Sequence, residues 1–519
     1  MERQEPRGID GREQGPCFYW LITRPAAYAM VFLLAGCGAG DDELTPNSPL
    51  TTPMALVVNQ EETTLTTLRL DGKFSPVVGT LSLGPAEPDA IGGVAFSLGE
   101  WIFITHTTGN RVAAIDPIGG PTPILEDFIT TNPANPLVRI GRRPTKIYRD
   151  PVDKEVLWTT NEGDPDGVDR LAGCTNGGSV SVLHNSHLGV GGGEKPRVTS
   201  RVCLSGRGEY FVAFSQPLPS EQEYVFVSSK TTGLVSVLLA LPLEGGGVAW
   251  SEFPTKIDLC DSVKEMALGY PVCDSTTATP NHSAPAGLFW SQATRKIYGY
   301  LSGYNSLIEI NPPLFKERAV SLSSSLPAPG ATSSFTVGIT PDGRELLVII
   351  EDRSDAHHVV TRFGSIDVTV SGPLTLTAIP VPILQDVRIG QFQFTPDGRQ
   401  VYLLASNDNT GLSPVQASNQ RKDVLFVVDR TPFQIAREIA LPPATSHAMD
   451  LWITGPAGVG SAKGVVVTNA TSGSNGTVSL ISASSGRIIS TFRVGRNPTM
   501  VTVYYAGLAR SDNQATPRW

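Results

Sequence analysis

An acidic loop holds the residues of this sequence whose types and spacing best suit chemistry. Residues 161–169 read NEGDPDGVD and gather carboxylate and amide oxygens in a short stretch. Calcium prefers six to eight oxygen ligands in proteins. We therefore predict Asp164, Asp166 and Asp169 as metal ligands, with calcium as the only candidate cofactor. The spacing is not that of an EF-hand, because no glycine holds the sixth position and no glutamate closes the loop; a solvated acidic turn is the alternative.

Histidine pairs are the second place where a metal could bind. His187 follows His184 at the i+3 position after an apolar run, and His357 and His358 are adjacent in a polar stretch. A zinc site needs three or four ligands with compatible geometry. The sequence near the first pair supplies no third ligand, so we interpret both pairs as loop histidines.

Glycine-rich stretches give no nucleotide-binding motif. Residues 188–196 fail the GxGxxG pattern because Glu194 replaces its last glycine, and residues 455–464 fail the P-loop pattern because Ser461 stands where lysine is needed. The chain has neither a GxSxG nucleophile motif nor an HExxH zinc motif. We therefore predict no catalytic residues and favour a protein that is not an enzyme.

Composition describes a turn-rich globular protein. The 519 residues include 52 glycines and 41 prolines, and only 17% are charged, against roughly 25% in typical domains. Abundant Val, Ile, Leu, Ser and Thr indicate many short strands joined by turns. A net charge of −9 without a basic stripe repels phosphate backbones, which excludes nucleic acid as a partner.

The N-terminal region carries an export signal. The apolar run at residues 26–34 is too short to span a bilayer as a helix and suits the central part of a signal peptide. It leads into Leu34-Ala35-Gly36-Cys37, which resembles the bacterial lipobox. The resemblance implies that Cys37 is lipidated through its thiolate and becomes the first residue of the mature protein. A buried core cysteine is the alternative interpretation.

The lipobox divides the chain and suggests its location. We predict a signal peptide at 1–36, a flexible tether at 37–53, a folded domain at 54–507 and a disordered tail at 508–519. The resemblance implies a lipid anchor in the cell envelope of a Gram-negative bacterium. Gly38 follows the cysteine in place of the aspartate that retains lipoproteins in the inner membrane, so the outer membrane is favoured.

Four further cysteines suit two disulfides in an oxidising compartment. They are Cys174, Cys203, Cys260 and Cys273. Three pairings are open, and we prefer the neighbour pairing, Cys174 with Cys203 and Cys260 with Cys273. None of the spacings is the CxxC of a zinc ribbon.

The candidate metal ligands and the four cysteines lie in a part of the chain that is built from repeated strand patterns. The clearest copies are at 334–350, 392–409, 423–441 and 463–505. Residues 341–344 and 396–399 both read PDGR, a turn in which aspartate bonds to the backbone and glycine adopts a positive φ. The strands that follow are apolar on both faces, as expected where sheets pack face to face.

The ordered motifs resemble the YVTN-type β-propeller repeat. A PDGR turn, a strand such as VYLLASND, a strand such as DVLFVVD and a final V-G-x-x-P segment recur between residues 54 and 507. The final segment is clearest at 494–498 (VGRNP) and at 140–144 (IGRRP). The resemblance implies an all-β fold with a single β-propeller.

Eight repeats are countable, although seven blades remain an alternative. The second strands are expected to begin near Ala55, Trp101, Glu155, Tyr224, Lys296, Glu345, Gln400 and Gly464. Seven first strands are expected near Gly93, Thr145, Tyr210, Gly287, Phe335, Phe392 and Ala448. The eighth first strand is found at the C-terminus, residues 499–505, so the last strand would complete the first blade and close the ring.

The predicted fold is compatible with several functions. The favoured interpretation is a lipid-anchored propeller that binds or scaffolds an envelope protein or a polysaccharide through its loops. The alternative is a propeller hydrolase, lyase or quinone-dependent oxidoreductase acting on a small sugar, lactone or polysaccharide. A redox partner that holds a non-covalent haem is a third interpretation.

Overall fold

The computed structural model describes most of the chain between residues 53 and 505. The described residues are 53–70, 77–83, 91–96, 102–116, 124–129, 140–153, 156–184, 197–216, 222–242, 248–254, 256–259, 285–301, 306–312, 316–321, 323–324, 333–353, 359–371, 374–380, 384–385, 387–407, 423–453, 462–471 and 473–505. The predicted signal peptide, the lipidation residue Cys37 and the predicted tail lie outside them. Within this part of the chain, no helix is long and apolar enough to cross a membrane.

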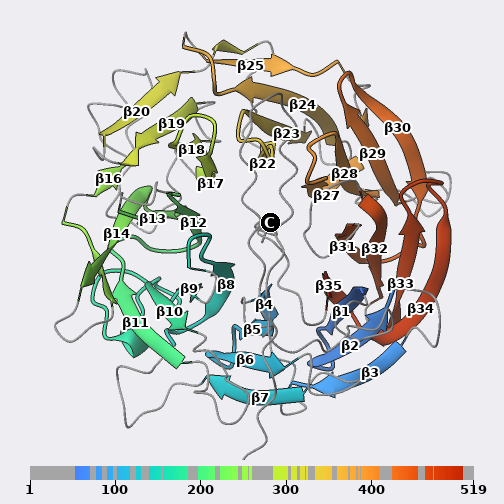
Figure 1. Ribbon diagram of the computed structural model, residues 1–519, viewed down its shortest axis with the longest axis horizontal. Coiled ribbons are helices and arrows are strands. Elements are labelled where there is room, and N and C mark those ends of the chain that lie inside the picture. The colour runs from blue at the N-terminus through green and yellow to red at the C-terminus, as the bar shows by residue number, and fades with distance from the viewer. Residues whose placement is uncertain are drawn as a thin grey trace, which may run out of the picture. The chain divides into compact units, whose positions relative to one another are not determined.

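The strands form eight sheets arranged in a ring, which we number as blades 1–8 (Figure 1), and their pairing is antiparallel except between the short β21 and β25. Blade 1 comprises β35 (Pro498–Tyr505), β1 (Pro53–Asn59), β2 (Thr64–Arg69) and β3 (Val77–Ser82). Blade 2 comprises β4 (Ile91–Phe96), β5 (Ile102–His106), β6 (Arg111–Asp116) and β7 (Ile124–Ile129). Blade 3 comprises β8 (Pro144–Arg149), β9 (Val156–Asn161), β10 (Ser179–His184) and β11 (Arg197–Cys203). Blade 4 comprises β12 (Tyr210–Phe214), β13 (Tyr224–Ser229), β14 (Leu234–Pro242), β15 (Val248–Glu252) and the short β16 (Ile257–Asp258).

The second half of the ring repeats this plan. Blade 5 comprises β17 (Pro285–Ser291), β18 (Lys296–Leu301), β19 (Ser306–Asn311) and β20 (Lys316–Ser321). Blade 6 comprises β22 (Ser333–Ile339), β23 (Glu345–Arg353), β24 (Val359–Asp367), β25 (Thr375–Ala378) and the short β21 (Ser323–Ser324) and β26 (Leu384–Gln385). Blade 7 comprises β27 (Val387–Phe394), β28 (Gln400–Asn407), β29 (Val424–Arg430) and β30 (Phe433–Ala440). Blade 8 comprises β31 (Ser446–Ile453), β32 (Ala462–Ala470), β33 (Asn475–Ser482) and β34 (Ile488–Arg496).

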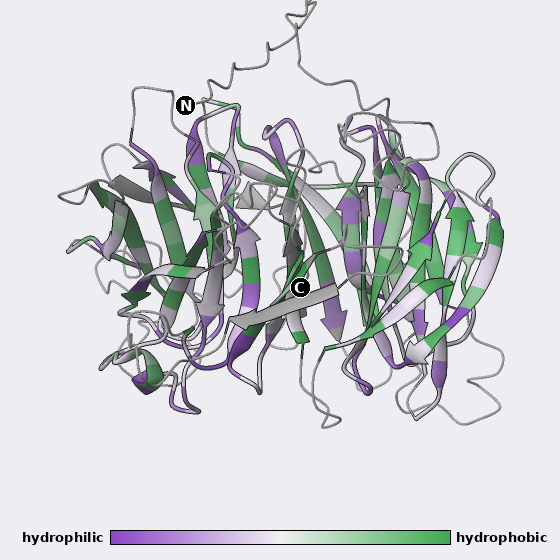
Figure 2. Cartoon of the chain, turned by 60° about the horizontal axis from the view of Figure 1, so that its bottom comes forward, coloured by the Kyte–Doolittle hydropathy of each residue, from purple (hydrophilic) through white to green (hydrophobic). Residues whose placement is uncertain are grey.

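The core lies between neighbouring blades because the second strands are apolar on both faces. Every residue of β5 and of β9 is buried. Trp158 of blade 3 belongs to one apolar cluster with Tyr210 and Val225 of blade 4. Figure 2 shows the hydrophobic colour concentrated along the strands, with hydrophilic colour at many of the turns. The face-to-face packing predicted from the two-sided apolar strands is confirmed.

Ring closure occurs as predicted. The C-terminal strand β35 pairs with β1, and the register places Tyr504 opposite Met54 and Val501 opposite Val57. In Figure 1 the red C-terminal strands therefore meet the blue N-terminal strands. The ring has eight blades, which decides between the two predicted numbers.

Side chains from one blade also hold the innermost strand of the next. Glu351 on β23 accepts a hydrogen bond from the backbone N–H of Ile389 on β27. Asp450 on β31 accepts one from Gln393 Nε2 at 3.0 Å and one from the backbone N–H of Val503 on β35 at 2.7 Å. The bonds to Ile389 and Val503 satisfy inner-strand backbone groups that the four-stranded ladders leave unpaired, and the bond from Gln393 joins side chains of β27 and β31.

Strand boundaries differ from the predictions where the apolar alternation is broken. The first strand of blade 7 begins at Val387, not near Phe392, and its pairing with β28 shifts register between Ile389 and Gln391. A β-bulge of this kind puts one extra residue into the strand, so the alternating pattern changes phase and hides its beginning.

The antiparallel order gives the ring two different ends. The turn from each second strand to its third strand lies at the same end as the connection into the next blade, because neighbouring strands run in opposite directions. We call this end the latch end. The turns from first to second strands, including both PDGR turns, lie at the opposite end.

Burying a charge in the closing strand should open the ring. Val501 is fully buried on β35, so Val501→Asp is expected to lower the free energy of unfolding by more than about 3 kcal/mol, because an unpaired carboxylate is costly in an apolar core. Urea unfolding measures this. Ile489→Asp on β34, where the side chain is 57% exposed, is the control and should change stability by no more than about 0.5 kcal/mol. Equal effects of the two variants would contradict the closure argument.

Candidate functional site

A compact contact at the latch end joins blade 8 to blade 1. Asn59, the last residue of β1, donates from Nδ2 to the hydroxyls of Thr64 and Thr66 on β2, at 3.0 and 2.9 Å. Gly495 lies against this carboxamide so closely that a Cβ there would be 2.6 Å from Asn59 Cγ. Arg496 pairs with Glu62 at 3.1 Å. We call this arrangement of Gly, Arg, Asn and acidic residue the latch.

Blade 3 contains a second latch with the same parts. Asn161, the last residue of β9, donates from Nδ2 to the hydroxyls of Ser179 and Ser181 on β10, at 2.9 and 3.0 Å. A Cβ on Gly141 would be 2.6 Å from Asn161 Nδ2. Arg142 pairs with Asp164 at 2.6 Å. The VGRNP segment at 494–498 supplies the glycine and the arginine of the blade 1 latch, and the IGRRP segment at 140–144 supplies those of the blade 3 latch.

Blade 8 repeats the carboxamide part alone. Asn469 on β32 donates from Nδ2 to Thr477 and Ser479 on β33, at 3.0 Å each. The three asparagines are buried, so these bonds satisfy side-chain NH2 groups that would otherwise be costly to remove from water.

The two complete latches differ in the turn that follows the asparagine. Blade 1 joins β1 to β2 through residues 60–63, whereas blade 3 joins β9 to β10 through residues 162–178. The latter is the longest connection between strands that the structure describes throughout, and we call it the blade 3 insert. Because blade 1 makes the same ladder with a short turn, the propeller fold does not require the insert.

A buried aspartate organises the insert. Asp169 is fully buried and caps the short 3-10 helix η3 (Arg170–Ala172) by accepting from the backbone N–H of Ala172 at 3.0 Å. Its carboxylate also accepts from Ser179 Oγ at 2.6 Å and from the backbone N–H of Arg142 at 3.1 Å. Burial raises the pKa of this carboxyl, and the three donors oppose that effect by stabilising the charged form.

A disulfide and a tyrosine fix the other end of the insert. Cys174 is bonded to Cys203 at the end of β11, which confirms this half of the predicted pairing. Tyr210 of blade 4 accepts from the backbone N–H of Gly178 at 2.8 Å and donates to the carbonyl of Gly206 at 2.7 Å. The insert is thus tied to its own blade and to the next one.

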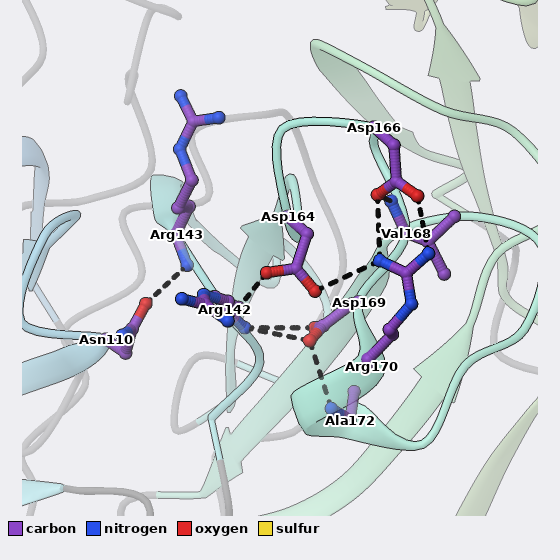
Figure 3. Close-up of polar contacts among 9 residues, drawn as sticks. All are labelled: Asn110, Arg142, Arg143, Asp164, Asp166, Val168, Asp169, Arg170 and Ala172. Carbon is purple, nitrogen blue, oxygen red and sulfur yellow. Dashed lines mark hydrogen bonds and ion pairs between the residues drawn. The ribbon is translucent and has the colours of Figure 1, made fainter.

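Three arginines lie over the acidic residues of the insert. Arg170 forms a bidentate pair with Asp166, with nitrogen–oxygen distances of 3.0 and 2.5 Å, and also contacts Asp164 at 3.3 Å (Figure 3). Arg143 is 3.5 Å from Glu162, and its guanidinium points away from Asp164 in Figure 3. The hydrogen bond from Arg170 holds the pKa of Asp166 below its usual value.

The three predicted calcium ligands therefore face partners from the chain itself. Asp164 and Asp166 face guanidinium groups, and Asp169 faces backbone and hydroxyl donors. Across the described residues, no group of three or more His, Cys, Asp or Glu side chains is arranged to hold a metal ion. Calcium binding at the loop stays a prediction, and the geometry describes ion pairs instead.

Other predicted residues are placed as follows. His184 ends β10 and is half-buried, while His187, His357, His358, Cys260 and Cys273 lie outside the described residues. Trp158 is fully buried and contacts Trp250 edge-on, with ring centroids 4.6 Å apart, as expected of a residue that packs blades together.

The sequence reasoning missed the arginines. It treated the loop as a set of oxygen ligands and considered Arg142 and Arg143 only as letters of a repeat motif. Two signals were available: Arg170 follows Asp166 by four residues, and IGRRP carries one more arginine than VGRNP. Which acidic residue each arginine would meet depends on ring packing, which no local pattern encodes.

A carboxyl pair at the opposite end joins blades 3 and 4. Asp150 is buried and accepts from Trp158 Nε1 at 3.0 Å and from the backbone N–H groups of Val152 and Asp153 at 2.9 Å each. Glu223 hydrogen-bonds to the same carboxylate. Burial, followed by the negative charge of Asp150, raises the pKa of Glu223 to about 9.

Comparisons with known proteins show the fold and nothing finer. No protein-family model and no curated protein sequence matches the chain. Among solved structures, dihydro-heme d1 dehydrogenase NirN in complex with DHE is similar at 13% identity and a TM-score of 0.51, over 88% of this chain and 76% of that one. Apo AztD from Citrobacter koseri has 13% identity and a TM-score of 0.49, over 87% and 98% of the two chains. The periplasmic gluconolactonase PpgL from Pseudomonas aeruginosa has 13% identity and a TM-score of 0.45, over 88% and 99%. The likeness to NirN, at a TM-score above 0.5 and 13% identity, is a likeness of fold alone.

Glu223 should make stability fall as pH rises. Its pKa is about 9 when folded and 4.5 as a free group, so the folded state holds a proton that unfolding releases across this interval. The free energy of unfolding should therefore decrease between about pH 5 and pH 9, and Glu223→Gln should weaken that decrease. Urea unfolding across this range measures it. Glu438→Gln on the outer strand β30 is the control and should keep the wild-type pH dependence. If Glu223→Gln also leaves the pH dependence of the free energy of unfolding unchanged, Glu223 does not hold the extra proton of the folded state.

Proposed function

We propose that this protein is a non-enzymatic binding module of the bacterial cell envelope, held to a membrane by a lipid on Cys37. In this proposal the blade 3 insert presents the surface that a partner recognises. The propeller acts as the rigid support from which the insert projects.

One observation carries the proposal. The same latch forms with residues 60–63 in blade 1 and with residues 162–178 in blade 3, so the extra chain adds nothing that the latch needs. Segments that the fold does not need and that are still ordered by specific contacts are good candidates for recognition.

The contacts of the insert support this role because they reduce the entropy lost on binding. Asp169, the Cys174–Cys203 disulfide and Tyr210 hold the insert at three separate points. A loop that is already ordered loses less conformational entropy when a partner binds, which increases affinity for the same contacts.

Replacing the insert should abolish binding and keep the fold. The variant exchanges residues 162–178 for the blade 1 turn, Gln-Glu-Glu-Thr, and carries Cys203→Ser so that no thiol is left unpaired. We expect native-like circular dichroism, because Asn161 and Ser179 form the ladder pair that Asn59 and Thr64 form in blade 1. We also expect loss of the envelope component that crosslinks to the wild-type chain in cells.

A variant without the disulfide is the comparison for the exchanged insert. Cys174→Ser with Cys203→Ser keeps the insert and removes only one of its attachments, so it should bind more weakly but still measurably. If the exchanged variant folds and crosslinks as the wild type does, the insert is not the recognition surface.

Lipidation is tested on the full chain expressed in a lipoprotein-competent bacterium. We expect the mature N-terminal peptide to begin at Cys37 and to carry a diacylglycerol mass, since the cysteine thiolate is the group that accepts the lipid. Cys37→Ala should retain residues 1–36 and carry no diacylglycerol mass. An unmodified wild-type N-terminal peptide would remove the anchor from the proposal.

A further inference from the structure

We infer that Arg142, Arg143 and Arg170 form a surface that binds an acidic segment of a partner protein. We call these three residues the arginine surface. The inference rests on the proposed function, because it names the partner chemistry of the same insert.

Arg143 has a conformation that its side chain does not favour. Its φ is +55°, in the left-handed region, where asparagine is much better tolerated than arginine. The equivalent residue of the blade 1 latch is Asn497, with φ +51°. The latch therefore works with asparagine, and the exposed ion pair that Arg143 adds with Glu162 contributes little to the stability of the fold.

The charges of the insert are arranged in two layers. The arginine side chains are outermost, with exposed fractions of 48% for Arg142, 46% for Arg143 and 59% for Arg170. Beneath them, Asp164 is 15% exposed and Glu162 is 19% exposed. Asp166 is also 46% exposed, so an approaching ligand meets three guanidinium groups and one carboxylate, and this excess of positive charge at the surface favours anions.

The insert already contains a carboxylate in the position that a ligand would take. Asp166 is paired with the two terminal nitrogens of Arg170 while its own side chain is 46% exposed. Such a bidentate pair is the geometry in which arginine recognises carboxylates. Because both partners are accessible, an aspartate or glutamate of another protein can exchange with Asp166 at this guanidinium.

An acidic polypeptide fits this surface better than a polysaccharide or a nucleic acid. Sugar rings and bases stack on exposed aromatic side chains, and the exposed large apolar residues in the described part of the chain are all aliphatic. The net charge of −9 further disfavours a uniformly charged polymer that would extend over the rest of the surface. A short acidic segment touches only the arginine surface.

Fluorescence anisotropy with a labelled oligoglutamate peptide tests the inference on the full chain in detergent. Arg143→Asn, which copies the blade 1 residue, should raise the Kd about five- to tenfold, since one charged contact is lost. Its unfolding midpoint should be no lower than that of the wild type, because asparagine suits the positive φ. Binding should weaken as salt is added, since exposed charges are screened.

The control removes the same charge from the other end of the ring. Arg399 lies in a PDGR turn, its side chain is 86% exposed, and Arg399→Asn should leave the Kd unchanged. Equal Kd values for the wild type and Arg143→Asn would overturn the inference, as would an Arg399→Asn effect of the same size. Tighter binding of polygalacturonate than of oligoglutamate would also overturn it, in favour of a polysaccharide. If Arg143→Asn still crosslinks normally in cells while the exchanged insert does not, the proposed function stands and only the acidic partner is wrong.

Discussion

Pairing between β35 and β1 is the constraint on which the rest of the molecule depends. A blade built only from residues 53–82 would have three strands, with an open edge along β1 facing the middle of the ring. The C-terminal strand covers that edge, and the strand order brings β34 of blade 8 beside blade 1. This juxtaposition places Gly495 against Asn59 and lets Arg496 reach Glu62. The blade 1 latch therefore exists only because the ring is closed.

The blade 3 latch has the same asparagine hydrogen bonds and arginine–carboxylate pair as the blade 1 latch, but it does not join the last blade to the first. Its asparagine is buried, and a buried carboxamide must find partners because water can no longer supply them. Hydroxyls at the first and third positions of the next strand accept the hydrogen bonds of the amide NH2 group, which leaves the intervening turn free to vary in length. That freedom explains how blade 3 can hold an insert of different size between strands whose register matches blade 1.

The acidic residues of the insert show how burial selects a partner. Asp169 is removed from water and must be stabilised by several hydrogen-bond donors, whereas Asp166 remains at the surface, where an ion pair with Arg170 contributes little to stability. The first residue therefore orders the loop, and the ion pair of the second adds little to the stability of the fold. Under the proposed function, recognition uses the exposed pair and folding uses the buried carboxylate.

The sequence by itself determined an all-β propeller of seven or eight blades, closed by the last strand, and it favoured the pairing of Cys174 with Cys203. These follow from local information: two-sided apolar strands, turn residues such as PDGR, and cysteines close in the chain. Only the tertiary structure decided that Arg142 meets Asp164, that Gly141 lies against Asn161 and Asp169, and that Asp150 shares its site with Glu223. Each of these contacts joins segments from different blades or distant turns, and its energy depends on burial and distance, which are properties of the packed ring and not of any short stretch of sequence.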